Sequence, residues 1–103
     1  MARHVLVVHT RPVEGKDAEF NEWYDTVHLP DVLKVDGFVA AQRYRAEPSV
    51  HGELPEFPYL AIYQVEADSL PDALAALSTA AKSMDMGDSL DRSGMATYAY
   101  TAI

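Results

Sequence analysis

Apolar side chains recur at every second position, or on both faces, in four short stretches that predict β-strands. In the first stretch, Leu6 and Val8 fall on one face while Val5 and Val7 fall on the other. In the last, Tyr98 shares a face with Tyr100. The predicted strands span residues 4–10, 38–45, 59–65 and 95–103. Because the first and third strands are apolar on both faces, we expect both faces of the sheet to be covered.

Two further stretches have the apolar spacing of amphipathic helices. The first covers residues 16–28, and the second begins at Ser69, a good N-cap residue followed by Pro71, and runs to about Met84. One stripe on the first helix, spaced i, i+3, i+4 and i+7, consists of Phe20, Trp23, Tyr24 and Val27. The buried side of the second is predicted to hold Leu70, Ala73, Leu74, Leu77, Ala81 and Met84.

The residues after the first helix predict a break in the chain. Pro30 disfavours the α conformation at Leu29, Asp31 can cap a fresh short turn, and Gly37 ends the segment. Two other segments have loop composition: residues 46–58, rich in Pro and Glu, and residues 84–89, which we expect to be polar and flexible.

The predicted order β-α-β-β-α-β indicates an α+β, ferredoxin-like fold in a single domain, residues 1–103. Right-handed crossovers place both helices on one face of one antiparallel sheet. The other face would then be a bare apolar surface, which soluble proteins avoid. Two sheets packed face to face about a two-fold axis cover it, so we expect a homodimer that forms a dimeric α+β barrel.

Composition and charge limit the classes of partner and the cellular compartment that we expect. The formal net charge of −8 repels phosphates, so neither nucleic acid nor an anionic membrane is an expected partner. The chain has no cysteine, which removes disulfides and thiolate chemistry and fits a reducing compartment. The first residues enter a strand without a leader-like segment, so we expect a cytoplasmic protein.

The segment from Trp23 to Asp31 (Trp-Tyr-Asp-Thr-Val-His-Leu-Pro-Asp), closing with Gly37-Phe38 after a first strand, resembles the first-helix motif of the EthD-like branch of the dimeric α+β barrel superfamily. The architecture extends this resemblance over the whole chain. That broad group includes small polyketide cyclases, muconolactone-type isomerases, cofactor-free monooxygenases, haem-degrading enzymes and proteins of unknown role in ether breakdown. The resemblance therefore implies a fold and leaves the reaction open.

His28, at the edge of the aromatic stripe, is the main candidate for a catalytic general acid/base. The helix end favours its imidazolium, whereas Trp23 and Tyr24 desolvate it and favour the neutral base. A purely structural role at the helix C-terminus is the alternative. Asp31 is the expected orienter, with an N-cap role as its alternative, and Tyr24 could donate a hydrogen bond to a substrate oxygen or simply pack in the core.

Other candidates rest on weaker signals. The stripe makes Phe20 and Trp23 expected walls of a substrate pocket, and Tyr63 is one of several tyrosines that could line it. Small polyketide cyclases are similar in having a histidine at the start of the first strand, which implies a substrate contact for His4. Methylmuconolactone isomerases are similar in having a second histidine in the loop before the third strand, which implies a catalytic role for His51. Arg43 and Arg45 are expected to be solvated on an edge strand.

No spacing of histidines and carboxylates predicts a metal site, and no phosphate- or dinucleotide-binding motif is present. We expect no cofactor, since the negative charge also disfavours haem propionates. The primary hypothesis is a cofactor-independent isomerase, cyclase or lyase that acts on a small apolar oxygenated metabolite between helices and sheet. The alternatives are a non-catalytic ligand-binding or accessory protein and a cofactor-free or haem-dependent monooxygenase.

Overall fold

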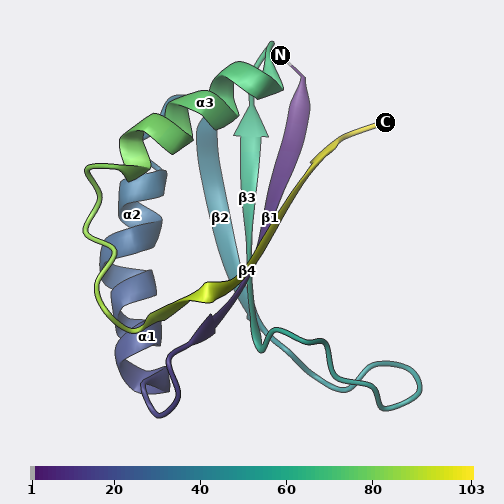
Figure 1. Cartoon of the computed structure of the whole chain (residues 1–103). Helices are drawn as coiled ribbons and strands as arrows, with labels where there is room; N and C mark the ends of the chain where they lie inside the picture. Colours follow the sequence, from purple (N-terminus) through teal and green to yellow (C-terminus); the bar gives the residue numbers. More distant parts are fainter. Residues whose placement is uncertain (1) are drawn as a thin grey trace.

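The computed structural model describes residues 2–103 and confirms the ferredoxin-like α+β fold. Four strands form one sheet in the order β2-β3-β1-β4, in which every neighbouring pair is antiparallel. The helices lie on one face of this sheet (Figure 1). The strands are β1 (Arg3–Pro12), β2 (Phe38–Arg45), β3 (Tyr59–Glu66) and β4 (Leu90–Thr101).

Strand register decides which side chains face the helices. Leu6 lies opposite Tyr63 of β3, and both are buried against the helices. Val5 lies opposite Tyr100 of β4 and belongs to the other face. The alternation predicted for the first and last strands is therefore confirmed, and it also separates His4, on the helix face, from His9, on the open face.

The open face of the sheet has no helix over it (Figure 1). Tyr98 and Tyr100 are 53% and 57% exposed there, next to the partly buried Val5 and Val7 on β1. Ile62, opposite Val7 on β3, extends this surface. The expectation of an uncovered, partly apolar sheet face is confirmed for the single chain.

The first helical stretch does not break at Pro30 as expected. It continues through α1 (Asp17–Trp23), a π-helix η1 (Tyr24–His28) and α2 (Leu29–Val32), and Leu29 has helical angles of φ −57° and ψ −48°. In the π-helix the backbone N–H of Leu29 reaches the carbonyl of Tyr24, five residues back. Pro30 follows as the second residue of α2, where the lack of an N–H costs little.

The expected N-cap role of Asp31 is therefore wrong. The residue that precedes α2 is His28, with helical φ and ψ, and Asp31 lies inside the short helix. Its carboxylate instead pairs with Lys34 at 3.7 Å. A fresh cap is not needed because the chain never leaves the helical conformation before α2.

The second helix, α3 (Leu70–Ala81), begins as predicted: Ser69 Oγ accepts a hydrogen bond from the backbone N–H of Asp72. It ends three residues before the expected end, and the chain then turns along residues 82–89 past α2 and α1 (Figure 1). Met84 and Met86 in this segment are partly buried against the core. No helix within residues 2–103 is long and apolar enough to cross a membrane.

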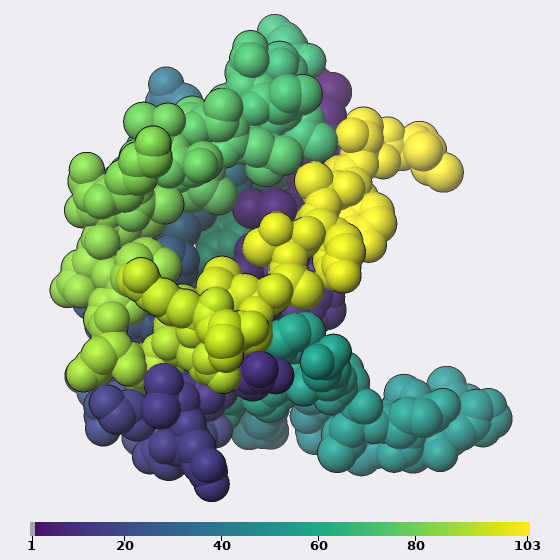
Figure 2. All heavy atoms as spheres, in the orientation of Figure 1, coloured from purple at the N-terminus to yellow at the C-terminus, as the bar shows by residue number. Residues whose placement is uncertain are grey.

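Residues 46–58, between β2 and β3, form an arm that extends from the end of the sheet, away from the side on which the helices lie (Figures 1 and 2). The base of the arm is closed by a hydrogen bond from the N–H of Ala46 to the carbonyl of Pro58 at 2.8 Å. The long loop expected from the composition of this segment is confirmed.

Candidate functional site

A hollow opens on the helix side of the sheet, between α3 with its following segment and the edge strand β4 (Figure 2). Atoms of β1, and of segments coloured blue and teal, form its floor. The helices cover the sheet only as far as β1, and the helix-facing residues Met95, Thr97 and Ala99 of β4 are exposed. The hollow opens toward the space between helices and sheet.

The predicted aromatic stripe forms one connected cluster. The ring centroid of Phe20 lies 6.1 Å from that of Trp23 and 5.5 Å from that of Tyr24, and the rings of Trp23 and Tyr24 lie 5.4 Å apart. All three side chains are buried, as the sequence predicts. Packed together, the three rings form an apolar wall beside the end of the π-helix.

His28 completes this wall. Its imidazole stacks on the indole of Trp23 at 4.8 Å with an interplanar angle of 22°, and stands perpendicular to the ring of Tyr24 at 5.1 Å. The Nδ1 atom of His28 is buried and has no hydrogen-bond partner among residues 2–103. A buried polar atom without a partner is costly, so it marks a place where a ligand could supply the missing bond.

The electrostatics of His28 favour the neutral ring. Burial lowers the pKa of His28 below its ordinary value, and the nearby carboxylate of Asp31 opposes this to a smaller extent. No hydrogen bond joins the two side chains within the described residues, so Asp31 acts on His28 through its charge. A neutral imidazole near physiological pH can accept a proton.

Tyr24 and Tyr63 meet in the core below His28. The hydroxyl of Tyr63 donates to the hydroxyl oxygen of Tyr24 at 3.2 Å, which leaves the proton of Tyr24 free to donate elsewhere. Burial raises the pKa of both hydroxyls, and the neighbouring Tyr24 raises that of Tyr63 further, whereas the hydrogen bond from Tyr63 partly offsets the rise in Tyr24. Both therefore remain protonated donors at physiological pH.

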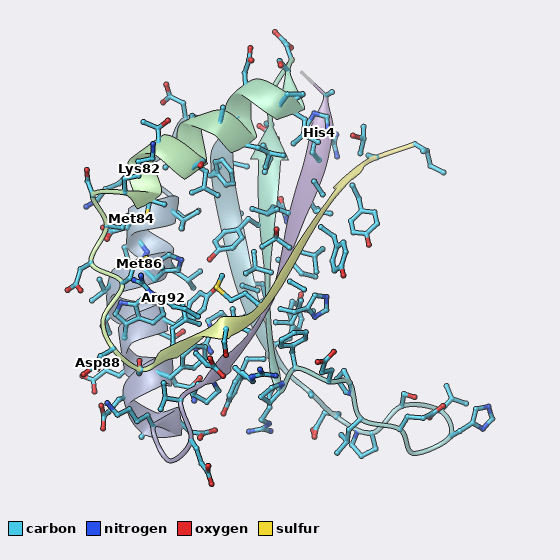
Figure 3. The ribbon with its side chains drawn as sticks, viewed as in Figure 1. His4, Lys82, Met84, Met86, Asp88 and Arg92 are labelled. Carbon is cyan, nitrogen blue, oxygen red and sulfur yellow. The ribbon has the colours of Figure 1, made fainter. Side chains whose placement is uncertain are left out.

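The segment after α3 holds Trp23 from the outside, which the sequence did not predict. The indole Nε1–H donates to the carbonyl of Asp85 at 2.9 Å, and the Cα of Gly87, with φ +61°, faces the indole so closely that a Cβ there would lie 3.3 Å from Cδ1. Figure 3 shows Met84 and Met86 along this segment. Residues 84–89, hereafter the strap, thus fix the ring on which His28 stacks.

Arg43 is another residue whose role the sequence did not predict. Its guanidinium lies 4.5 Å from the ring centroid of Tyr24 and donates to Asn21 and Asp25 of the first helical stretch. The expectation of a solvated side chain is wrong, because only 13% of it is exposed. Arg43 joins β2 to the back of the aromatic cluster.

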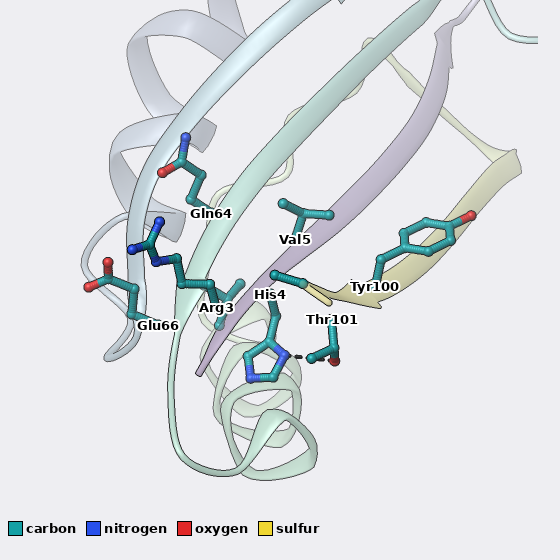
Figure 4. A pocket seen from close by; sticks show the side chains of 9 residues that line it. Arg3, His4, Val5, Gln64, Glu66, Tyr100 and Thr101 are labelled. Atoms are coloured by element: carbon teal, nitrogen blue, oxygen red, sulfur yellow. Dashed lines mark hydrogen bonds between the residues drawn. The ribbon is translucent and has the colours of Figure 1, made fainter. Parts of the chain in front are cut away.

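His4 lies at the far end of the sheet, where both of its ring nitrogens form hydrogen bonds. The carbonyl of Ala67 accepts from Nε2 at 3.1 Å, so in the neutral ring Nδ1 accepts from the hydroxyl of Thr101 at 2.8 Å. A pocket of about 380 Å³ adjoins it, formed by the ends of β1, β3 and β4 (Figure 4). Tyr100 and Val5 line this pocket from the open face, so it is separate from the aromatic cluster.

His51 is exposed on the arm, which leads away from the helices (Figure 1). The structure therefore brings together His28, Trp23, Tyr24, Phe20 and Tyr63, with Asp31 close enough to act by charge. Within one chain it does not bring His4 or His51 to this group. Candidate residues 20–28 were predictable from helical spacing, whereas the strap was not.

No protein-family model and no curated protein matches the sequence. Solved structures do match. An ethyl tert-butyl ether D (EthD) family protein from Bacillus halodurans is 21% identical with a TM-score of 0.64, over 100% of both chains. An EthD-like protein from Ralstonia eutropha is 17% identical with a TM-score of 0.66, over 99% of this chain and 91% of that one.

A dimeric ferredoxin-like protein of unknown function from Jannaschia is 14% identical with a TM-score of 0.55, over 95% of this chain and 97% of that one. At such identities the likeness establishes the fold. The chain thus shares its fold, over its whole length, with proteins described as EthD-like and as dimeric ferredoxin-like.

Proposed function

We propose that this protein is a cofactor-independent acid/base enzyme of the isomerase, cyclase or lyase type, acting on a small, largely apolar, oxygenated metabolite. The observation that carries the proposal is the buried Nδ1 of His28, which has no partner within residues 2–103 although the ring is fixed by stacking on Trp23. A purely structural histidine would satisfy this atom. Its position in a π-helix also fits, since such turns are frequent at functional sites.

The neutral imidazole of His28 would take a proton from a carbon next to a carbonyl group. The electron pair of the broken C–H bond moves into the carbonyl, and the oxygen gains negative charge. The free proton of Tyr24 donates a hydrogen bond to that oxygen. The imidazolium of His28 then returns the proton to another carbon or to a leaving group, and the ring is neutral again.

The other candidate residues support these two. Asp31 stabilises the imidazolium by charge after proton transfer, and Tyr63 positions the oxygen of Tyr24. Phe20 and Trp23 provide an apolar wall that excludes water. His4 can contact a substrate only after giving up a hydrogen bond to Ala67 or Thr101, so we assign it the least direct part.

A second copy of the chain is part of the proposal. Tyr98, Tyr100 and the neighbouring aliphatic side chains leave an apolar sheet face open to solvent, and a face-to-face homodimer covers it. The sheet edges β2 and β4 are free in the single chain, and pairing them closes the sheets into an eight-stranded barrel. Sedimentation velocity on the purified protein tests this part.

Proton exchange with solvent tests the chemistry without knowledge of the full reaction. A panel of small apolar lactones and β-diketones is incubated with the protein in D₂O, and loss of the α-proton signal is followed by NMR. We expect the wild type to accelerate exchange on at least one compound and His28→Gln to reduce it by about 10²-fold or more. His9→Gln, which removes an imidazole from the open face, is the matched control, and it should leave the rate unchanged in a sample that sedimentation velocity shows to have the oligomeric state of the wild type.

The alternatives predict other outcomes of the same experiment. A ligand-binding protein would shift panel resonances without exchanging any proton, in both the wild type and His28→Gln. A monooxygenase would consume oxygen, which an electrode in the same sample detects. Either result, or exchange that survives in His28→Gln, would overturn the assignment of His28 as a general base.

A further inference from the structure

The arm, residues 46–58, is ordered at its tip although the tip has no body to pack on. The N–H of Ser49 donates to the carbonyl of Glu53 and the N–H of Gly52 donates to the carbonyl of Ser49, both at 2.9 Å. The carboxylate of Glu53 accepts from Ser49 Oγ at 2.8 Å and from the N–H of His51 at 3.1 Å. Four hydrogen bonds thus fix one turn, a larger number than a solvated linker needs.

This ordered tip presents apolar side chains to solvent. Val50 is 92% exposed and Leu54 is 65% exposed, and among the large apolar residues at positions 2–103 only Ile103 is more exposed than these two. The tips of loops usually carry polar residues, because exposing an apolar side chain to water is unfavourable in free energy. A fixed turn that displays a valine and a leucine has the form of a contact surface without its partner.

The base of the arm sets its direction. Phe57 packs on the open face, with its ring centroid 5.9 Å from that of His9 and 5.6 Å below the guanidinium of Arg11. His9 belongs to the open face by strand register, and the arm extends from the sheet toward this uncovered side (Figures 1 and 2). Phe57 holds it there.

The length of the arm suits a second copy of this chain as its partner. The chain from its base to its tip can extend about 15 Å, whereas two packed sheets lie about 10 Å apart. A second sheet on the open face would thus lie within the reach of the arm. From these observations we infer that the arm of one copy docks on a second copy of this chain, with Val50 and Leu54 as the buried contacts.

The inference rests on the proposed homodimer and goes beyond it, because sheet packing alone requires no arm. It also gives His51 a place: His51 follows Val50 directly, so docking carries its imidazole onto the second copy. The arm holds Glu47, Glu53 and Glu56, and its docking on a second copy therefore adds charge as well as apolar area to that surface.

Single-cysteine labelling tests the docking directly, because the chain has no cysteine of its own. The Val50→Cys variant is labelled with a maleimide reagent at concentrations above and below the dimer midpoint. We expect labelling about tenfold or more slower in the dimer than after dilution. Val13→Cys, an exposed position beside the first helix, is the matched control and should be labelled at the same rate at both concentrations.

A dilution series with two variants separates this inference from the dimer itself. Val50→Ser combined with Leu54→Ser should weaken dimerisation about tenfold or more, since two apolar side chains lose their burial. Ile62→Asp places a charge on the open face and tests sheet packing. A monomeric wild type overturns both proposals. A dimer that is weakened by Ile62→Asp but keeps its affinity in the arm variant, with the Val50→Cys variant labelled equally fast at both concentrations, overturns the docking of the arm alone.

Discussion

Substitution of Gly87 by alanine tests the contact between the strap and the indole of Trp23. Gly87 has φ +61°, and an added Cβ would lie 3.3 Å from Cδ1 of the indole. The left-handed conformation costs an L-residue about 1–2 kcal/mol. The close approach adds to this because either the indole or the strap must move by a few tenths of an ångström. We expect Gly87→Ala to lower the free energy of unfolding by about 2–3 kcal/mol in total.

Gly15→Ala separates the two contributions. Gly15 has φ +81°, and its added Cβ would meet nothing within 4 Å among the described residues. This control carries the conformational cost without the contact, so we expect it to lose only about 1–2 kcal/mol. Since 1 kcal/mol moves the melting temperature of a domain of this size by about 4–8 °C, calorimetry can resolve the difference.

Fluorescence reports the contact itself, because Trp23 is the only tryptophan. We expect the wavelength of its emission maximum to shift in Gly87→Ala, because the contact between the indole and the strap is disrupted, and to stay unchanged in Gly15→Ala. Equal destabilisation by the two variants, together with unchanged emission in both, would show that the strap does not pack against Trp23 in solution. The strap would then have no part in fixing the ring beneath His28.

Four further substitutions probe the same cluster. Tyr63→Phe removes the donor to Tyr24 and should cost about 1–2 kcal/mol in chemical denaturation, while Tyr24→Phe in the same chain should recover part of this loss because no buried hydroxyl is then left unpaired. Burial lowers the folded-state pKa of His28 below 6.5, so its contribution to the free energy of unfolding should be fully present above pH 6.5 and fall as the pH decreases through the folded-state pKa. His28→Gln should lack this part of the pH dependence. Parallel curves of unfolding free energy against pH for the two proteins would refute the expected titration of His28. Arg43→Lys should lower stability by about 1 kcal/mol or more, since a lysine lacks the planar face that lies over Tyr24 and the fork that reaches Asn21 and Asp25.

Local spacing was sufficient to predict the fold and the identity of the aromatic cluster. Phe20, Trp23 and Tyr24 follow helical periodicity, and the strands follow alternation, so each local signal agrees with the global arrangement. The N-cap of α3 at Ser69 was also predicted, because capping depends on residues three apart. These features need no knowledge of distant contacts.

The features that were not predicted depend on pairs far apart in the chain. The hydrogen bond of Trp23 to Asp85 spans 62 residues, and the contact of Arg43 with Asp25 spans 18. The polar composition of residues 84–89 indicates a flexible linker, yet backbone atoms, a glycine and two methionines of this segment fit the indole and the core. The break expected at Pro30 is absent because the rule for the residue before proline is only a bias against the α conformation, and Leu29 adopts that conformation as the first residue of α2.

The π-helix at Tyr24–His28 also makes the aim of His28 depend on the number of residues in the turn as well as on their identity. A π-turn accommodates one more residue than an α-turn, and each residue of a helix advances it by about 100°. Removing one residue from this turn would rotate α2 and the chain after it relative to α1. Trp23 and His28 could then not remain stacked while α2 and the sheet kept their present contacts. In a comparison with natural variants of this fold, the length of this turn is therefore as informative a marker of the proposed site as the histidine itself.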